Sequence, residues 1–242
     1  MQTAFVIAVF EFVLLIFSLS VHECAHAWVA SRLGDQTARL QGRVTLNPIY
    51  HVDPFGTLLF PALALFLFHG GLLFGWAKPT PVITRNFKRI VRDDNLVTLA
   101  GPVSNLLLVL VAFVVLAILI VAVPGGRELI LSTFQGQQAT ALGSAVGAVV
   151  LLAILAIQLN LTLFFFNLLP VPPLDGSRIV RNLLPYNAMQ VYDRLSGFAG
   201  MAVMIILGWF LLPLVMGPSM GLFFGTLLSL PGPHGAPMQP IQ

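Results

Sequence analysis

The chain has 242 residues, of which 57% are hydrophobic and only 9% are charged. Soluble domains average about 25% charged residues, so this composition excludes an ordinary soluble protein and indicates an integral membrane protein. The formal net charge of +3 is too small to indicate a nucleic-acid partner, and we expect none. We expect a single membrane domain over residues 1–230 and a disordered tail, rich in Pro and Gly, over residues 231–242.

The first apolar run extends from Ala4 to Ala30 and exceeds the roughly 20 residues that cross a bilayer. No Lys or Arg precedes Arg32, and no small-residue cleavage site follows a short apolar core. We therefore expect a retained membrane helix and not a removable signal peptide. This helix carries His22, Glu23 and His26, and ionisable residues inside a membrane helix are costly enough to be functional candidates by default.

The stretch that follows this helix, Thr37 to Leu46, alternates polar and apolar side chains with a period of two. Such alternation predicts a β-strand with one polar and one apolar face. We expect it to contribute to a small membrane-associated β-sheet at the membrane boundary. An open strand edge could pair with an extended peptide, or the strand could simply seal the loop, and the sequence leaves both roles open.

A second apolar stretch, residues 55–74, contains Pro61, His69 and two adjacent glycines, which disfavour a straight spanning helix. Lys and Arg collect on the cytoplasmic side of short loops. Eight of the twelve lie between Arg32 and Arg92, on both sides of this stretch. A full crossing would separate these basic flanks, so we predict that the segment re-enters the membrane and returns.

Three more apolar segments approach or exceed the length needed to span: Leu96 to Val123, Val146 to Leu169, and Phe198 to Met216. Only Arg127 lies in the loop between the first two, whereas three basic residues follow the second. This asymmetry predicts about four transmembrane helices, with the N-terminus outside and the first helix ending in the cytoplasm. Gly217-Pro218 interrupts the last run before a short apolar piece, residues 220–230, which either spans or folds back.

The residues His22, Glu23 and His26 form an HExxH motif. Positions i and i+4 share one helix face, so both imidazoles can bind one Zn²⁺ while the Glu serves as general base. A catalytic zinc usually has three protein ligands and a water, so a third ligand is needed. Asp175 is the best candidate because it follows the proline-rich break at residues 170–173, and irregular backbone at membrane depth must be buried in protein or line a wet cavity.

The geometry permits this third ligand under one condition. His22 and His26 lie about 10 to 16 Å below the cytoplasmic end of their helix if it ends near Leu33. Asp175 follows the cytoplasmic end of the third long segment. The three side chains therefore meet only if that chain dips inward or its helix ends early, which the prolines would permit.

Three motifs in this order resemble the site-2 protease family of intramembrane zinc metalloproteases. They are the HExxH on the first membrane helix, the stretch from Ala100 to Asn105 that opens the second, and the NxxPxxxLDG-like run from Asn167 to Gly176. The resemblance covers roughly residues 4–181. It implies an α-helical integral membrane protein that hydrolyses peptide bonds.

The resemblance also implies a role for individual residues. The family's two zinc-binding histidines and its zinc-binding aspartate correspond to His22, His26 and Asp175. The family's catalytic base corresponds to Glu23. The family's asparagine upstream of LDG, thought to help hold substrate or the intermediate, corresponds to Asn167.

Further implications concern substrate binding and domain content. Asn105 is a second candidate for substrate binding, with capping or cross-linking of helices as the alternative. The strand region after the first helix is expected to form a membrane-dipping sheet that clamps substrate. Many members of the family carry a PDZ or a CBS domain, for which the loop at residues 124–143 and the tail are too short, so we expect a compact prokaryotic member.

The expected function is that of a multi-pass zinc metalloendopeptidase of the cell membrane. Its active site would open toward the cytoplasm and act on a transmembrane protein or peptide substrate in the lipid bilayer. A metal-ion transporter is one alternative, but it predicts several ligand sets and an internal repeat, which the sequence lacks. A catalytically inactive relative that binds membrane proteins is the other, and the intact Glu23 argues against it.

Overall fold

The computed structural model describes residues 2–63, 75–194 and 197–231. By length and composition, four helices in this part of the chain can cross a membrane. They are α1 (Gln2–Leu33), α4 (Ile90–Ala122), α7 (Ala145–Asn167) and α10 (Phe198–Leu228). The four apolar segments predicted from the sequence are therefore confirmed as helices, with their ends shifted.

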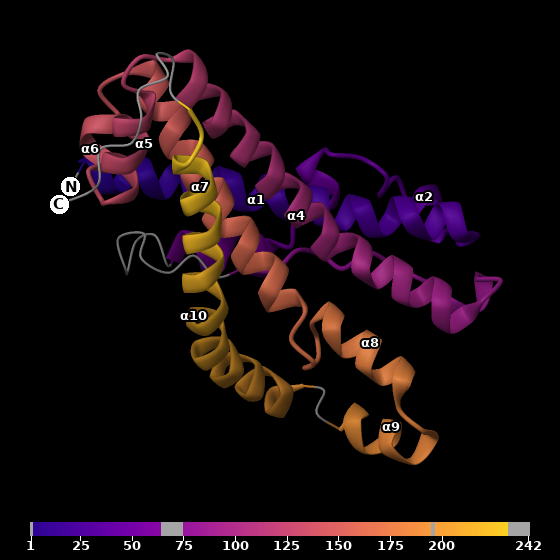
Figure 1. Ribbon diagram of the computed structural model, residues 1–242. Helices are drawn as coiled ribbons and strands as arrows, with labels where there is room; N and C mark the ends of the chain where they lie inside the picture. Colours follow the sequence, from indigo (N-terminus) through magenta and orange to yellow (C-terminus); the bar gives the residue numbers. More distant parts are fainter. Residues whose placement is uncertain (1, 64–74, 195–196, 232–242) are drawn as a thin grey trace.

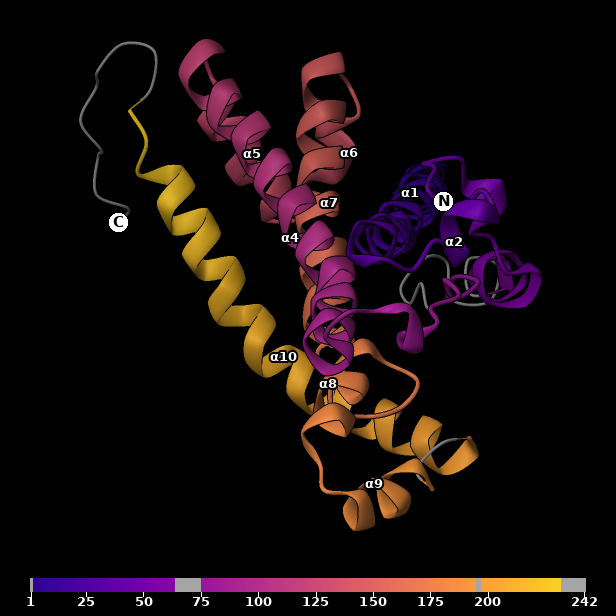
Figure 2. The ribbon, with the colours of Figure 1, turned by 90° about the vertical axis from the view of Figure 1, so that its right-hand side faces the viewer.

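The helix α4 packs against both α1 and α7, and α1 also contacts α7 directly (Figures 1 and 2). The last helix, α10, packs against α7 and α4. Near the start of α1, two short helices join α4 to α7: α5 (Gly126–Phe134) and α6 (Gln138–Ala141). Three more lie toward the opposite end of the bundle: α2 (Thr37–Leu40), α8 (Asp175–Leu183) and α9 (Tyr186–Asp193).

The largest apolar core forms where α4, α5, α7 and α10 meet. Its large buried side chains are Val109, Leu116, Ile120, Ile130, Val150, Ile154, Ile157, Leu161, Phe224 and Leu227. On α4 and α7 these residues, together with the buried Ala112, recur every three or four positions, which places them on one face of each helix. The core therefore fixes the α4, α7 and α10 side of the bundle, while α1 packs against α4 and α7 through separate apolar clusters.

The predicted β-sheet after the first helix is wrong, because the described residues contain no strand. The stretch from Thr37 to Leu46 begins with the short helix α2 and continues in turns. Its apolar side chains do not share a buried face. Ala38 is fully buried, whereas Leu40 is 85% exposed and Leu46 is 57% exposed.

The side chain of Asp35 explains why a turn and a helix replace the strand. Its carboxylate accepts hydrogen bonds from the N–H of Thr37 at 3.1 Å and from the Thr37 hydroxyl at 2.6 Å, which closes a turn just before the alternating residues. It also accepts from the N–H of Ile83 at 2.7 Å and from the amide of Asn86 at 2.8 Å. These bonds compete successfully with a strand, so they override the period-two pattern.

The predicted re-entrant segment, residues 55–74, falls only partly within the described residues. Pro54–Leu63 is a short apolar helix that begins with one π-helical stretch, η2 (Pro54–Leu59). Asp53 caps this start by accepting hydrogen bonds from the N–H groups of Phe55 at 3.0 Å and Gly56 at 2.7 Å. Residues 64–74 lie outside the description, so the re-entry itself stays a prediction.

The helix α10 continues through Gly217 and Pro218 and does not end there. Helix breakers are tolerated in membrane helices because neighbouring groups satisfy the freed backbone atoms again. Residues 220–228 therefore extend the last membrane helix and are not a separate piece that folds back. The predicted tail, from residue 232 onward, lies outside the described residues.

Substituting Asp35 tests its structural role. Asp35→Ala removes the acceptor of the hydrogen bonds from Thr37, Ile83 and Asn86, and one such bond contributes about 0.5 to 1.5 kcal/mol. We expect a lower midpoint of thermal unfolding in detergent at neutral pH. The exposed Glu128, changed to Gln, serves as a control that should leave the midpoint unchanged.

The same variant should show a defined pH dependence. Burial opposes ionisation of Asp35, but hydrogen bonds from Thr37, Ile83 and Asn86 outweigh it and hold the pKa of the carboxyl below its usual value. The stabilisation is therefore complete above the ordinary aspartate pKa of about 3.9 and declines as the pH falls below it. The difference in midpoint between wild type and Asp35→Ala should shrink in acid, and a constant difference would contradict this account.

Candidate metal centre

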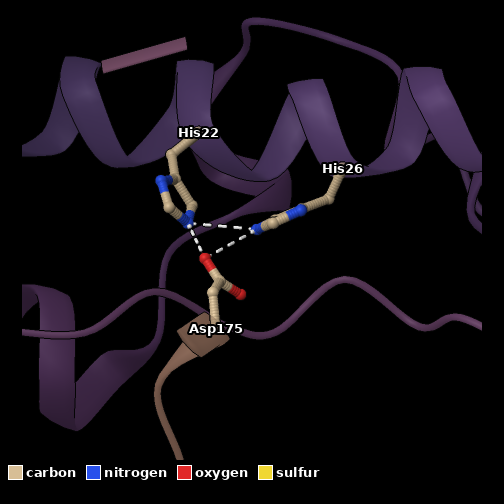
Figure 3. Close-up of side chains that lie close together, drawn as sticks. All are labelled: His22, His26 and Asp175. Carbon is tan, nitrogen blue, oxygen red and sulfur yellow. Dashed lines mark hydrogen bonds and ion pairs between the residues drawn. The ribbon is translucent and has the colours of Figure 1, made fainter. Parts of the chain in front are cut away.

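Three side chains, His22, His26 and Asp175, converge on one point between α1 and the start of α8 (Figure 3). Asp175 Oδ2 lies 3.1 Å from His22 Nε2 and 3.3 Å from His26 Nε2, and the two Nε2 atoms are 3.1 Å apart. Within the described residues they form the one group of His, Cys, Asp or Glu side chains close enough to share a metal ion. The predicted third ligand thus lies beside the two predicted histidines.

The arrangement of these atoms fits a tetrahedral zinc ion. Ligand atoms about 2.0 to 2.1 Å from a tetrahedral zinc lie roughly 3.3 Å from one another. His26 Nδ1 lies 2.7 Å from the carbonyl oxygen of Val97 and donates its proton there, which leaves the lone pair of Nε2 directed at Asp175. Asp175 Oδ2 is itself buried without a hydrogen-bond partner among the described residues. Facing lone pairs in a buried site repel unless a cation lies between them, so this donor set suits Zn²⁺.

The charge state of Asp175 also suits a ligand. Burial opposes its ionisation, but the two adjacent imidazoles outweigh burial and hold the pKa of the carboxyl well below its usual value. The ionised form therefore dominates at neutral pH. Metal ions bind this form of a carboxyl group.

The non-helical segment between α7 and α8 brings Asp175 inward. α7 ends at Asn167, two residues before the predicted end of that segment, and Asp175 is the first residue of α8. Gly176 lies so close to the carbonyl oxygen of Leu168 that a Cβ atom there would overlap it. Glycine at this position therefore allows α8 to pack closely against the end of α7. The early end of α7 meets the condition under which Asp175 can reach the histidines.

The helix α4 provides none of the three candidate ligands but helps to position them. Gly101 faces the two imidazole rings so closely that a Cβ atom would overlap ring atoms of both His22 and His26. Near the start of α4, the buried Asp94 accepts hydrogen bonds from Arg178 and from Asn182, each at 2.7 Å. Both donors belong to α8, so this network fixes the helix that begins with Asp175.

Beside the three candidate metal ligands, Glu23 is held by a residue far away in the sequence. The N–H of Thr80 donates to Glu23 Oε2 at 2.7 Å, and the Thr80 hydroxyl donates to the backbone oxygen of Glu23 at 3.0 Å. Thr80 stands between Pro79 and Pro81, so it carries the only N–H group of these three residues. Sequence reasoning missed Thr80 and Asp94 because neither belongs to a motif and both act through long-range contacts.

A cavity of about 480 Å³ opens beside these groups. Glu23, Asp175, Thr80 and both histidines line it. The rest of its wall is largely apolar and includes Leu19, Trp76, Val82, Leu163, Phe166 and Met204. The site therefore combines a compact polar cluster with space for an apolar molecule or chain segment.

The two predicted substrate-binding residues are placed differently. Asn167 lines the cavity, and its amide nitrogen donates to the carbonyl of Leu163 at 2.9 Å. Asn105 is fully buried and is not among the lining residues, and neither polar atom of its side chain has a partner in the described part of the chain. Substrate binding stays a prediction for both residues, and the cavity wall supports it for Asn167 alone.

Comparisons with known proteins agree with this geometry. The Bacillus subtilis protein YwhC, named a zinc metalloprotease, is 44% identical over 171 residues, which are 71% of this chain and 67% of that protein. Rip2 of Mycobacterium tuberculosis, also named a zinc metalloprotease, is 30% identical over 210 residues, or 87% of this chain and 68% of the relative. Rip2 of Mycolicibacterium smegmatis is 31% identical over 159 residues and is matched over only 51% of its length. No solved structure matches the chain.

A family profile covers most of the helical bundle. The profile of peptidase family M50 matches residues 10–211, a range that contains His22, His26, Asp175 and the whole of α4 and α7. Members of this family are zinc-dependent metalloproteases of the site-2 type, which agrees with the donor set described above. The chain therefore belongs to peptidase family M50.

Proposed function

We propose that the protein is an intramembrane zinc metalloendopeptidase that cuts membrane-spanning proteins. In this proposal His22, His26 and Asp175 bind zinc, Glu23 is the general base, and Asn167 contacts the substrate. The observation that carries the proposal is the convergence of two imidazoles and one carboxylate, within 3.3 Å of one another, beside a cavity that Glu23 also lines.

The depth of the site supports hydrolysis inside the membrane. α1 ends at Leu33, so His22 and His26 lie about 10 to 16 Å from its end along the helix axis. The cavity wall is largely apolar, as a binding site for a membrane segment must be. The substrate class is therefore proposed as transmembrane protein or peptide.

The chemistry assigns a task to each polar group. Bound zinc would polarise the scissile carbonyl and acidify a water molecule. Glu23 would accept the proton of that water and pass it to the leaving amine. The N–H of Thr80, 2.7 Å from Glu23 Oε2, holds the carboxylate in one orientation for this transfer. A helical substrate has its carbonyl groups hydrogen-bonded within the helix, so it must unwind before attack.

Charge placement supports a cavity that opens to the cytoplasm. Arg127 lies on α5, whereas Arg178 and Arg181 lie on α8, toward the opposite end of the bundle (Figure 1). Arg32 lies in the last turn of α1 and Arg92 in the first turn of α4, and these two helix ends lie toward the α8 end. Because basic residues collect on the cytoplasmic side, we propose a multi-pass protein of the cell membrane with the α8 end in the cytoplasm.

The first prediction separates catalysis from metal binding. Glu23→Gln keeps the shape of the side chain but cannot accept a proton, so cleavage of a membrane-anchored reporter should fall by about 10²- to 10⁴-fold. Zinc content, measured on the purified protein, should stay at the wild-type level. Glu11→Gln, on the same helix, is the matched control and should retain activity. Undiminished turnover in the Glu23 variant would remove the proposed base.

The second prediction concerns the third ligand. Asp175→Asn replaces a charged ligand by a neutral amide, so zinc affinity should fall by at least about tenfold in competition with a chromophoric chelator. Asp193→Asn, at an exposed carboxylate paired with Arg181 at 2.8 Å, is the control and should keep wild-type affinity. Equal affinities of the two variants would exclude Asp175 as a ligand.

The third prediction tests the contact between Thr80 and the base. Thr80→Val removes the hydroxyl group that bonds to the backbone of Glu23, and one such bond contributes about 0.5 to 1.5 kcal/mol, so kcat should fall roughly two- to tenfold. KM and zinc content should change little, and Thr80→Ser should restore the rate. A Thr80→Val enzyme with full kcat would show that this contact does not support the base.

A further inference from the structure

A second cavity, of about 460 Å³, lies where the end of α1 meets the start of α4. Four basic side chains line it: Arg32, Lys88, Arg89 and Arg92. Arg32 belongs to the last turn of α1, whereas the other three come from the chain that leads into α4 and from its first turn. The fold therefore brings two separate basic segments to one concave surface.

The positive charge of this cavity is not neutralised within the protein. None of the four cations forms an ion pair with a carboxylate in the described part of the chain, and all four are exposed. The acidic side chain in the wall, Asp93, is only 5% exposed, and its Oδ2 accepts a hydrogen bond from the N–H of Arg89 at 2.9 Å. Four cations therefore surround one carboxylate that is already engaged.

The surroundings of the cavity are those of a membrane interface. Trp28 lies one helical turn before Arg32 and is 51% exposed, and the Arg32 guanidinium lies over its ring, 5.4 Å from the centroid. Ile90 and Val91, at the start of α4, are also more than half exposed. Tryptophan is enriched at the level of lipid headgroups, and long basic side chains extend from apolar surface toward that level. Apolar contacts for acyl chains and cations for a phosphate therefore occur side by side.

We propose that this cavity binds the headgroup of an anionic phospholipid. The phosphodiester would contact the basic side chains, and the acyl chains would lie along Trp28 and the start of α4. A basic bias that only sets topology has no need to form a concave site. Arg39 and Arg85 are also exposed, but they do not line the cavity. They therefore serve as control positions for the effect of charge alone.

The test uses the full chain, purified in detergent, and phosphatidylglycerol as the probe. Each cation near an anionic lipid surface strengthens binding about fivefold, so Arg32→Gln/Arg92→Gln should lower the affinity for phosphatidylglycerol by roughly 25-fold. Arg39→Gln/Arg85→Gln removes the same charge and should change it less than about twofold. Native mass spectrometry of the retained lipid provides the measurement, and phosphatidylcholine should be retained equally weakly by all forms.

Several outcomes would overturn the proposal. Equal losses in the two double variants would mean diffuse attraction to the surface, and equal retention of phosphatidylcholine would mean no preference for anionic lipid. Full competition by millimolar inorganic phosphate would indicate a site for a free anion. If Arg32→Gln/Arg92→Gln does not fold, Lys88→Gln/Arg89→Gln replaces it. The measurement involves no proteolysis, so it is independent of the proposed function.

Discussion

The structure depends on the close approach of two imidazoles and one carboxylate inside an apolar bundle. Their ligand atoms lie 3.1 to 3.3 Å apart, at which distance lone pairs repel in a buried environment. A metal ion between these atoms would convert this repulsion into binding, because each of the three atoms would then face positive charge. Without such an ion, burial of three ionisable groups at this depth would be costly.

Several unusual features of the chain follow from this requirement. The carboxylate of Asp175 must reach the level of the histidines. For this reason α7 ends early, at Asn167, and α8 begins with Asp175. The turn between them is tight enough to require Gly176 beside the Leu168 carbonyl. On the other side of the site, only the lack of a side chain at Gly101 leaves room for both rings. Features that would weaken an ordinary helix are here conditions for the site.

The sequence was sufficient to predict the parts of the protein that depend on local patterns. Hydropathy identified the four helices that are long and apolar enough to span a membrane, and the spacing of His22 and His26 placed both on one face of α1. Asp175 could be predicted because prolines mark the helix break before it. The resemblance to the site-2 proteases agrees with the M50 profile that the chain matches.

Predictions failed or fell short where contacts between distant residues decide the structure. The alternating residues after α1 form no strand, because Asp35 binds Thr37 nearby and Ile83 and Asn86 far along the chain. Local reasoning also expected an interruption at Pro218, although a membrane helix can continue through proline. The contact from Thr80 to Glu23 joins residues 57 positions apart and leaves no signature in either segment.

All three candidate ligands depend on α4 for their positions, and this has a consequence for altering the site. The carbonyl of Val97 orients one imidazole, Gly101 leaves space for both, and Asp94 holds the helix that begins with the carboxylate. None of these residues is chemically reactive, so a survey that ranks side chains by reactivity would overlook them. A transplant of the ligands into another scaffold would have to carry this inert helix along with them.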